Sequence, residues 1–161
     1  MPPLSQKRSF NRTYKSSLWR VIEFHTMKKD IEFPIVDGIK ITIARNINED
    51  NEAEWNVYLI NRLKTNIDTV LITSRGYGFD KNGEPIKTSE LRHFHKHCIA
   101  GEIIKIEMIT PDVFHLNNEY WVSYYIGNQI FDKKFIFVPD SIREENLIII
   151  ENLNLKGVLH E

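Results

Sequence analysis

Three observations predict an all-β fold, specifically an antiparallel β-sandwich. β-Branched and aromatic residues dominate the apolar set, with nine Phe, six Tyr and three Trp among 161 residues, and these residue types favour strands. Strand-like segments recur roughly every 8 to 13 residues, with turn-forming residues between them. No helical periodicity extends over about ten residues or more. An open β-barrel is the alternative. The term immunoglobulin-like would describe the architecture only, because one cysteine cannot form the disulfide of antibody domains.

Two tight-turn signals predict hairpins. Asp37-Gly38 lies between the strand-like residues 31–36 and 39–44, and this pair readily adopts the positive φ angles of a primed turn. Gly127-Asn128 predicts a second hairpin for the same reason. The remaining strands are predicted from alternation and composition at residues 55–63, 69–79, 90–99, 103–109, 119–126, 129–138 and 147–155.

Glycine, proline and polar residues predict the irregular segments. Gly76 and Gly78 predict a bulge or bend in the strand that contains them. The turn-forming residues in the range 80–89 predict a loop. Residues 110–118 predict a loop with one helical turn, which Thr110 would cap.

The charge of the chain is unevenly distributed. Residues 1–20 contain five basic residues and no acidic residue, whereas the other residues include 16 basic and 22 acidic ones. We therefore expect a basic, flexible N-terminal arm over residues 1–20 and a single β-sandwich domain over residues 21–161. The arm is either a solvated terminus or a site for nucleic acid or another polyanion, with cationic side chains at Lys7, Arg8, Arg12 and Lys15.

Composition also bears on location and chemistry. One cysteine excludes an intrachain disulfide and a cysteine-based zinc site, and it fits a reducing compartment. The sequence shows neither the apolar segment of a signal peptide nor an apolar run of about eighteen residues. We expect a cytoplasmic protein without a membrane span. The sequence contains no nucleotide-binding loop or serine-hydrolase motif, so no catalytic residue is predicted.

Residues 91–99 concentrate the candidate chemistry, because they hold three of the six histidines and the only cysteine. In a regular strand, His93, His95 and His97 would share one face, with neighbours roughly 6.5 to 7 Å apart. Two of these imidazoles can bind one divalent metal ion if another segment supplies a further ligand. The candidates for that ligand are His115, Glu107 and Glu119.

Two other interpretations of the three histidines need no metal ion. They can form an ordinary polar strand face that packs on neighbouring aromatic residues. They can also form a pH-responsive patch, because protonated imidazoles repel one another below about pH 6.5. No cofactor is expected apart from this possible divalent metal.

Cys98 invites comparison with catalytic cysteines, because it directly follows His97. Adjacent residues of a strand point to opposite faces, so His97 cannot activate the thiol. The sequence therefore predicts a buried structural cysteine.

Basic and aromatic residues of the body form a further candidate surface. The basic ones could join the arm in binding RNA or another polyanion. Tyr120, Trp121, Tyr124 and Tyr125 alternate over both faces of one strand, so some would pack in the core and the others could stack on bases or sugars. The basic residues are Arg75, Arg92, Lys96, Lys133 and Lys134.

Three phrases of the sequence resemble a small uncharacterised family of bacterial all-β proteins. They are Thr73-Ser74-Arg75-Gly76-Tyr77-Gly78, Leu91-Arg92-His93-Phe94 and Phe131-Asp132-Lys133-Lys134-Phe135. The resemblance extends from about residue 31 to the C-terminus. Some members are automatically labelled as aminoacyl-tRNA synthetase subunits. This chain is too short for such a catalytic domain and has no ATP-binding motif, so the resemblance implies no activity.

The sequence thus supports three functional hypotheses. The leading one is a non-enzymatic binding or interaction module with an unidentified protein partner. The second is an RNA or polyanion binder that uses the basic arm. The third is a metal-dependent enzyme or metal-binding protein centred on His93, His95 and His97.

Overall fold

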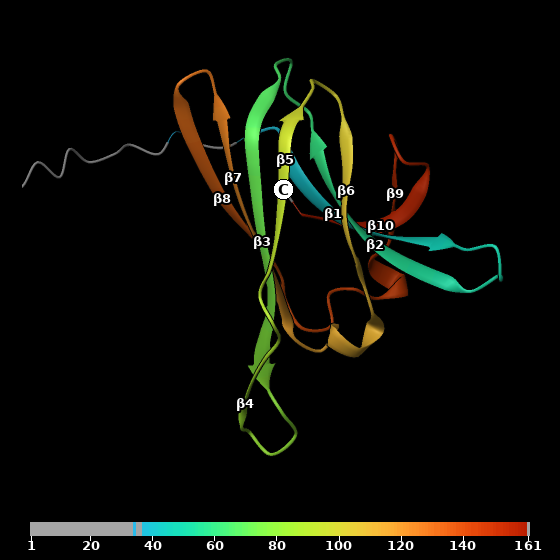
Figure 1. Ribbon diagram of the computed structural model, residues 1–161. Coiled ribbons are helices and arrows are strands. Elements are labelled where there is room, and N and C mark those ends of the chain that lie inside the picture. Colours follow the sequence, from blue (N-terminus) through green and yellow to red (C-terminus); the bar gives the residue numbers. More distant parts are fainter. Residues whose placement is uncertain (1–33, 35–36, 161) are drawn as a thin grey trace, which may run out of the picture. The chain divides into compact units, whose positions relative to one another are not determined.

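Ten strands and two short 3₁₀ helices make up the described part of the chain. The computed structural model describes residue 34 and residues 37–160 (Figure 1). The elements are β1 Ile39–Ile47, β2 Ala53–Asn61, β3 Ile67–Phe79, β4 Pro85–Lys87, β5 Leu91–Cys98, β6 Ile103–Ile109, η1 Pro111–Val113, β7 Asn117–Ile126, β8 Gln129–Phe137, η2 Glu144–Asn146, β9 Ile148–Ile150 and β10 Leu155–His160.

The strands form two antiparallel sheets of five strands each. The first sheet has the order β6-β2-β1-β10-β9. The second has the order β4-β3-β7-β8. β4 and β5 pair with the same edge of β3, β4 at residues 77–79 and β5 at residues 67–74. Neither sheet closes on itself within the described residues. The predicted antiparallel β-sandwich is therefore confirmed.

The apolar core lies between the two sheets. Alternate residues of β1 and β2 are fully buried in it, among them Ile43 and Val57. The second sheet contributes large aromatic side chains such as Tyr124 and Phe135, and Tyr124 stacks on Phe131 with ring centroids 5.3 Å apart. The period of two in the sequence thus places the apolar side chains against each other.

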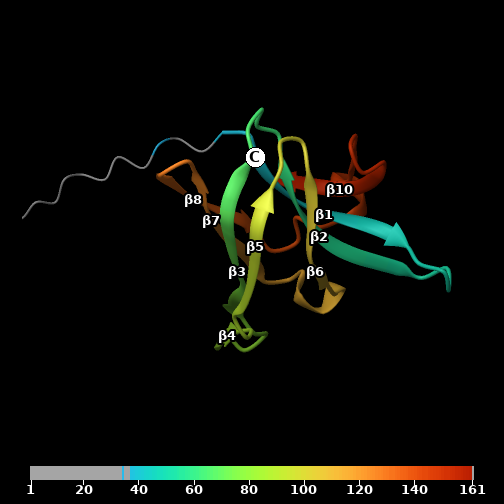
Figure 2. The same cartoon turned by 45° about the horizontal axis from the view of Figure 1, so that its top comes forward.

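β5 and β6 lie side by side at one edge of the sandwich, although they belong to different sheets (Figures 1 and 2). A tight turn joins them, in which Gly101 has a φ of 78° and the N–H of Glu102 donates to the carbonyl of Ile99. This edge brings the histidine strand close to β6.

The first strand of the hairpin predicted around Asp37-Gly38 lies outside the described residues, apart from residue 34. Its second strand belongs to β1, which over Ile41–Arg45 pairs with β2 on one side and β10 on the other. The hairpin predicted at Gly127-Asn128 is confirmed by the pairing of β7 with β8.

Other irregularities also differ from the prediction. β3 passes through Gly76 and Gly78 without a register shift against β7 or β4 there. The predicted loop at residues 80–89 contains the short strand β4, and residues 147–155 contain β9 and only the first residue of β10. Thr110 occupies the N-cap position of η1, but its side chain makes no capping hydrogen bond.

The predicted basic arm, residues 1–20, lies outside the described residues. Across residues 34 and 37–160, no helix has the length and apolar character needed to cross a membrane.

Candidate functional site

The three histidines of β5 do not share one face. His93 and His95 are partly buried, whereas the side chain of His97 is 58% exposed. Cys98, the next residue, is fully buried in the core. Lys96 and His97 are both exposed, so the alternation of inward- and outward-facing side chains is shifted by one residue between His95 and Cys98. The expected row of three histidines is therefore wrong at His97.

A β-bulge in the neighbouring strand accounts for this shift. β3 and β5 pair in constant register. Thr69 of β3 has a φ of 52°, and β3 shifts its register against β7 between Asp68 and Leu71. One extra residue reverses which side chains face the core. As a result, Ile67 and Val70 both face inward, and β5 follows the same change.

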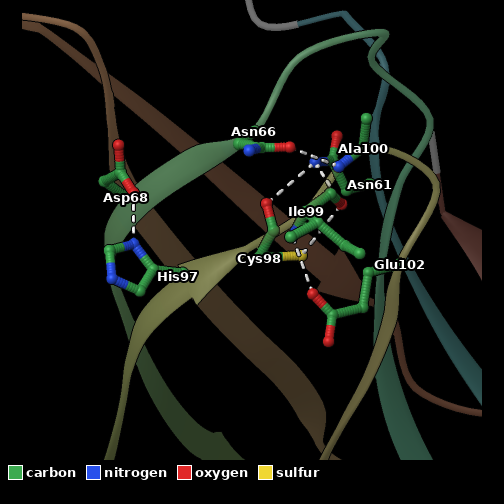
Figure 3. Close-up of polar contacts among 8 residues, drawn as sticks. All are labelled: Asn61, Asn66, Asp68, His97, Cys98, Ile99, Ala100 and Glu102. Carbon is green, nitrogen blue, oxygen red and sulfur yellow. Dashed lines mark hydrogen bonds and ion pairs between the residues drawn. The ribbon is translucent and has the colours of Figure 1, made fainter.

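His97 and Cys98 consequently have separate surroundings (Figure 3). Nδ1 of His97 lies 2.5 Å from Oδ1 of Asp68. Sγ of Cys98 lies 3.9 Å from the carbonyl oxygen of Ile99. Burial, together with the nearby Glu102 carboxylate, raises the pKa of the Cys98 thiol to about 12. Cys98 is therefore buried, as predicted from the sequence, and its thiol is protonated at neutral pH.

Alkaline pH is expected to destabilise the fold through Cys98. The thiol pKa is about 8.5 in an unfolded chain, so ionisation favours unfolding. The stabilising contribution is complete below about pH 8.5 and is lost as the pH rises toward 12. Urea midpoints should fall with pH above about 8.5, and the fall should be shallower in Cys98→Ala. Equal slopes for the two proteins, or fast labelling of the native thiol by Ellman's reagent, would contradict this.

A second β-bulge turns Glu107 into the space between the sheets. β6 pairs with β2 through Lys105 with Tyr58 and Glu107 with Val57, which leaves Ile106 as the extra residue. Regular alternation would place Glu107 on the same face as the exposed Lys105. The bulge instead places it opposite the buried Val57, and its side chain is only 13% exposed.

Glu107 accepts hydrogen bonds from three side chains of the second sheet. Oγ of Ser74 lies 2.9 Å from Oε2 of Glu107, and Nε2 of His93 lies 2.7 Å from the same oxygen. The hydroxyl of Tyr120 donates to Oε1 over 3.1 Å. An ionised carboxylate only accepts, so Nε2 of His93 is the donor. These four residues are named the Glu107 cluster.

The Glu107 cluster gathers hydrogen-bond donors around one carboxylate. Ser74 and Nε2 of His93 both donate to Oε2 of Glu107, so His93 Nε2 is not the acceptor of the Ser74 hydroxyl hydrogen as it would be in a serine–histidine pair. Burial raises the pKa of Tyr120 well above its usual range, and the adjacent carboxylate adds to the effect. Tyr120 therefore stays a protonated donor. A carboxylate has about four acceptor positions, so Oε1 of Glu107 keeps capacity for another donor.

A pocket of about 370 Å³ opens beside the Glu107 cluster. It lies near Arg75 and Gly76 of β3, between the part of β3 that pairs with β5 and the part that pairs with β4. Ser74, Glu107 and Tyr120 contribute to its lining. The other lining residues are hydroxyl-bearing, amide or apolar: Thr88, Ser89, Leu91, Met108, Ile109, Thr110, Val113 and Asn118.

The structure does not bring the predicted metal ligands together. His93 reaches Glu107, but His97 pairs with Asp68 and His115 is exposed before β7. Glu119 is buried and forms ion pairs away from these histidines. In the part of the chain that the structure describes, no group of three or more His, Cys, Asp or Glu side chains is placed to hold a metal ion.

Four exposed apolar side chains on neighbouring strands of the second sheet, all on its outer face, are named here the outer aromatic face. Leu71 of β3 pairs with Phe94 of β5, and Trp121 and Tyr125 lie on β7, the other neighbour of β3. Their exposed fractions are 41%, 63%, 47% and 37% respectively. Tyr120 and Tyr124 are buried in the core, so the expected division of the aromatic strand between two faces is confirmed.

Paired charges surround Trp121 on this face. Its indole Nε1 donates to Asp132 over 3.2 Å, and Nζ of Lys134 lies 4.8 Å from the ring centroid. Glu119 forms ion pairs with Arg75 at 2.8 Å and with Lys134 at 3.5 Å. Arg75 and Lys134, two of the predicted polyanion-binding residues, are therefore already ion-paired with a carboxylate.

The other predicted cationic residues do not form one surface, since they lie on different strands or outside the described residues. Arg92 pairs with Thr73 in the sheet and forms an ion pair with Glu90 at 3.0 Å, and Lys96 is exposed further along β5. Lys133 lies opposite the core residue Val122, with Nζ 5.0 Å from the ring centroid of Phe135. Lys7, Arg8, Arg12 and Lys15 lie outside the described residues.

Sequence reasoning missed two members of the Glu107 cluster. Ser74 and Tyr120 carry no motif, and they reach Glu107 only because three strands of two sheets meet. Glu107 is one of the candidate ligands that the sequence predicts beside the histidines, and the structure places it in contact with His93.

The chain matches no protein-family model, no curated protein and no solved structure. The resemblance to a bacterial family and the cytoplasmic location therefore stay predictions.

Proposed function

We propose that the chain is a non-enzymatic interaction module that binds a protein partner through the outer aromatic face. The observation that carries this proposal is the exposure of Phe94 and Trp121 on strands that flank β3 on opposite sides. Grouped, exposed apolar side chains mark interaction sites, and aromatic residues supply much of the binding energy of protein interfaces.

The charges around the face favour a protein over a polyanion as the partner. Arg75 and Lys134 share the carboxylate of Glu119, and Arg92 pairs with Glu90. A phosphate backbone would have to displace these carboxylates, and residues 21–161 carry six more acidic than basic residues. A protein surface that presents an apolar patch bordered by both signs of charge fits this pattern.

Photocrosslinking tests the proposal and identifies the partner. A photoreactive phenylalanine analogue at position 94 should crosslink to a protein in cells of the source organism. The same analogue at Ile149, an equally exposed apolar residue of β9 in the first sheet, should not give that product. The binding affinity for the purified partner should then fall about 30-fold or more in Phe94→Ala and Trp121→Ala, because buried aromatic anchors dominate interfaces. Ile149→Ala should leave the affinity unchanged.

Three results would overturn the proposal. One is a product at position 94 that nuclease digests, which would show that nucleic acid occupies the face. Another is crosslinking only to a second copy of the chain. The third is an affinity for the purified partner that neither aromatic substitution changes.

A further inference from the structure

We propose that the pocket beside the Glu107 cluster binds a small organic cation, such as a primary amine attached to a compact apolar group. The pocket lies between the sheets and Phe94 and Trp121 lie on the outer face, so this site is separate from the proposed protein interface.

The charge of the pocket favours a cation. Among the lining residues that the structure describes, Glu107 carries the only carboxylate, and two of its three donors, Ser74 and Tyr120, are neutral groups. The third donor, His93, is charged only when protonated. Arg75 also lines the pocket, but its guanidinium is bonded to Glu119. A cation at Oε1 of Glu107 would therefore meet a negative charge that is largely shielded from water.

The lining and size of the pocket favour an organic cation over a bare metal ion. A divalent ion needs several anionic or carbonyl ligands, and the described residues gather no such group here. An ammonium group needs only the carboxylate and hydroxyl acceptors such as Ser89 and Thr110. Leu91, Ile109 and Val113 add apolar surface for the remainder of the molecule, and about 370 Å³ is the size of a small-ligand pocket.

Three probes of similar size test this inference: benzylamine, benzyl alcohol and benzoate. By calorimetry near neutral pH, benzylamine should bind about tenfold or more tightly than benzyl alcohol, because only the ammonium carries a positive charge that pairs with the carboxylate. Benzoate should bind most weakly of the three. Backbone chemical shifts should change at the pocket residues Gly76, Leu91 and Ile109.

Two carboxylate variants separate the site from a general charge effect. Glu107→Gln keeps the shape of the side chain and should lower the benzylamine affinity about tenfold or more. Asp68→Asn is the matched control, because Asp68 also pairs with a histidine of β5, His97, but is not part of the pocket lining. It should change the affinity less than about twofold, within the scatter expected for a distant site.

Leu91→Trp gives a test that does not depend on the charged cluster. The larger side chain should fill the pocket and abolish binding of benzylamine, even if Glu107→Gln fails to fold. The proposal is overturned if the three probes bind equally, if Glu107→Gln or Leu91→Trp binds benzylamine like the wild type, or if benzylamine causes no shift changes up to about 10 mM, a concentration that detects weak fragments.

Discussion

Replacing Gly157 by valine is expected to lower the free energy of unfolding by about 3 kcal/mol or more. Gly157 lies within β10, between Ala44 of β1 and Ile148 of β9. A Cβ at this position would lie 2.8 Å from the carbonyl oxygen of Ile43 and 2.9 Å from Cα of Ala44. Both contacts are with the backbone of a central strand, so only a shift of that strand could relieve them.

Urea unfolding followed by tryptophan fluorescence measures this effect. Gly101→Ala is the matched control, because Gly101 has a φ of 78° but a Cβ there would meet nothing within 4 Å. Its cost should be limited to backbone strain of about 1 kcal/mol. If Gly157→Val unfolded at the wild-type midpoint, the close approach of β10 to β1 would be wrong.

Gly157 also explains why sequence reasoning misplaced the last strand. Glycine has a low strand propensity, so the pattern ended at residue 155, whereas β10 continues to His160. The advantage of glycine here is the close approach to Ala44, which is a property of strand pairing and not of the local sequence. The short strand β4 was not predicted for a related reason. Asn82-Gly83 and Pro85 are strong loop signals in the sequence, whereas β4 forms only through the pairing of three residues with β3.

Elements with a regular period of two were predictable. Residues 103–109 are apolar enough to give β6 with the same bounds, and Gly127, with a φ of 57°, forms the turn between β7 and β8. In β7 the local signal and the tertiary structure agree, because Tyr120, Val122 and Tyr124 all face the core. The sandwich follows from this agreement repeated over most strands.

The candidate site was not predictable, because two bulges decide which side chains face inward. Thr69 has a positive φ, a conformation that β-branched residues rarely adopt, so the residue type does not predict a bulge at this position. Ile106 is likewise an ordinary strand residue. Regular alternation therefore groups His97 with His93 and places Glu107 with Lys105, and the structure reverses both assignments.

Replacing Asn61 by leucine is expected to cost about 3 to 5 kcal/mol of folding stability. Asn61 is fully buried at the end of β2. Its Nδ2 donates to the carbonyl oxygens of Thr65 at 3.1 Å and Ile99 at 3.0 Å, and its Oδ1 accepts from the N–H of Leu63 at 3.0 Å (Figure 3 shows the contact with the β5–β6 turn). Leucine fills a similar volume but leaves these backbone groups without a partner, at about 1 to 3 kcal/mol for each buried one.

Asn66→Ala is the matched control for this substitution. Oδ1 of Asn66 accepts one hydrogen bond, from the N–H of Ala100 at 2.9 Å, and its side chain is exposed, so water can replace it at a cost of about 1 kcal/mol or less. Urea unfolding compares the two variants, and hydrogen exchange at Leu63 should be accelerated only in Asn61→Leu. Equal losses of stability would mean that backbone pairing alone, such as the 2.9 Å bond from the N–H of Gly101 to the carbonyl of Asn61, holds the β5–β6 turn against β2.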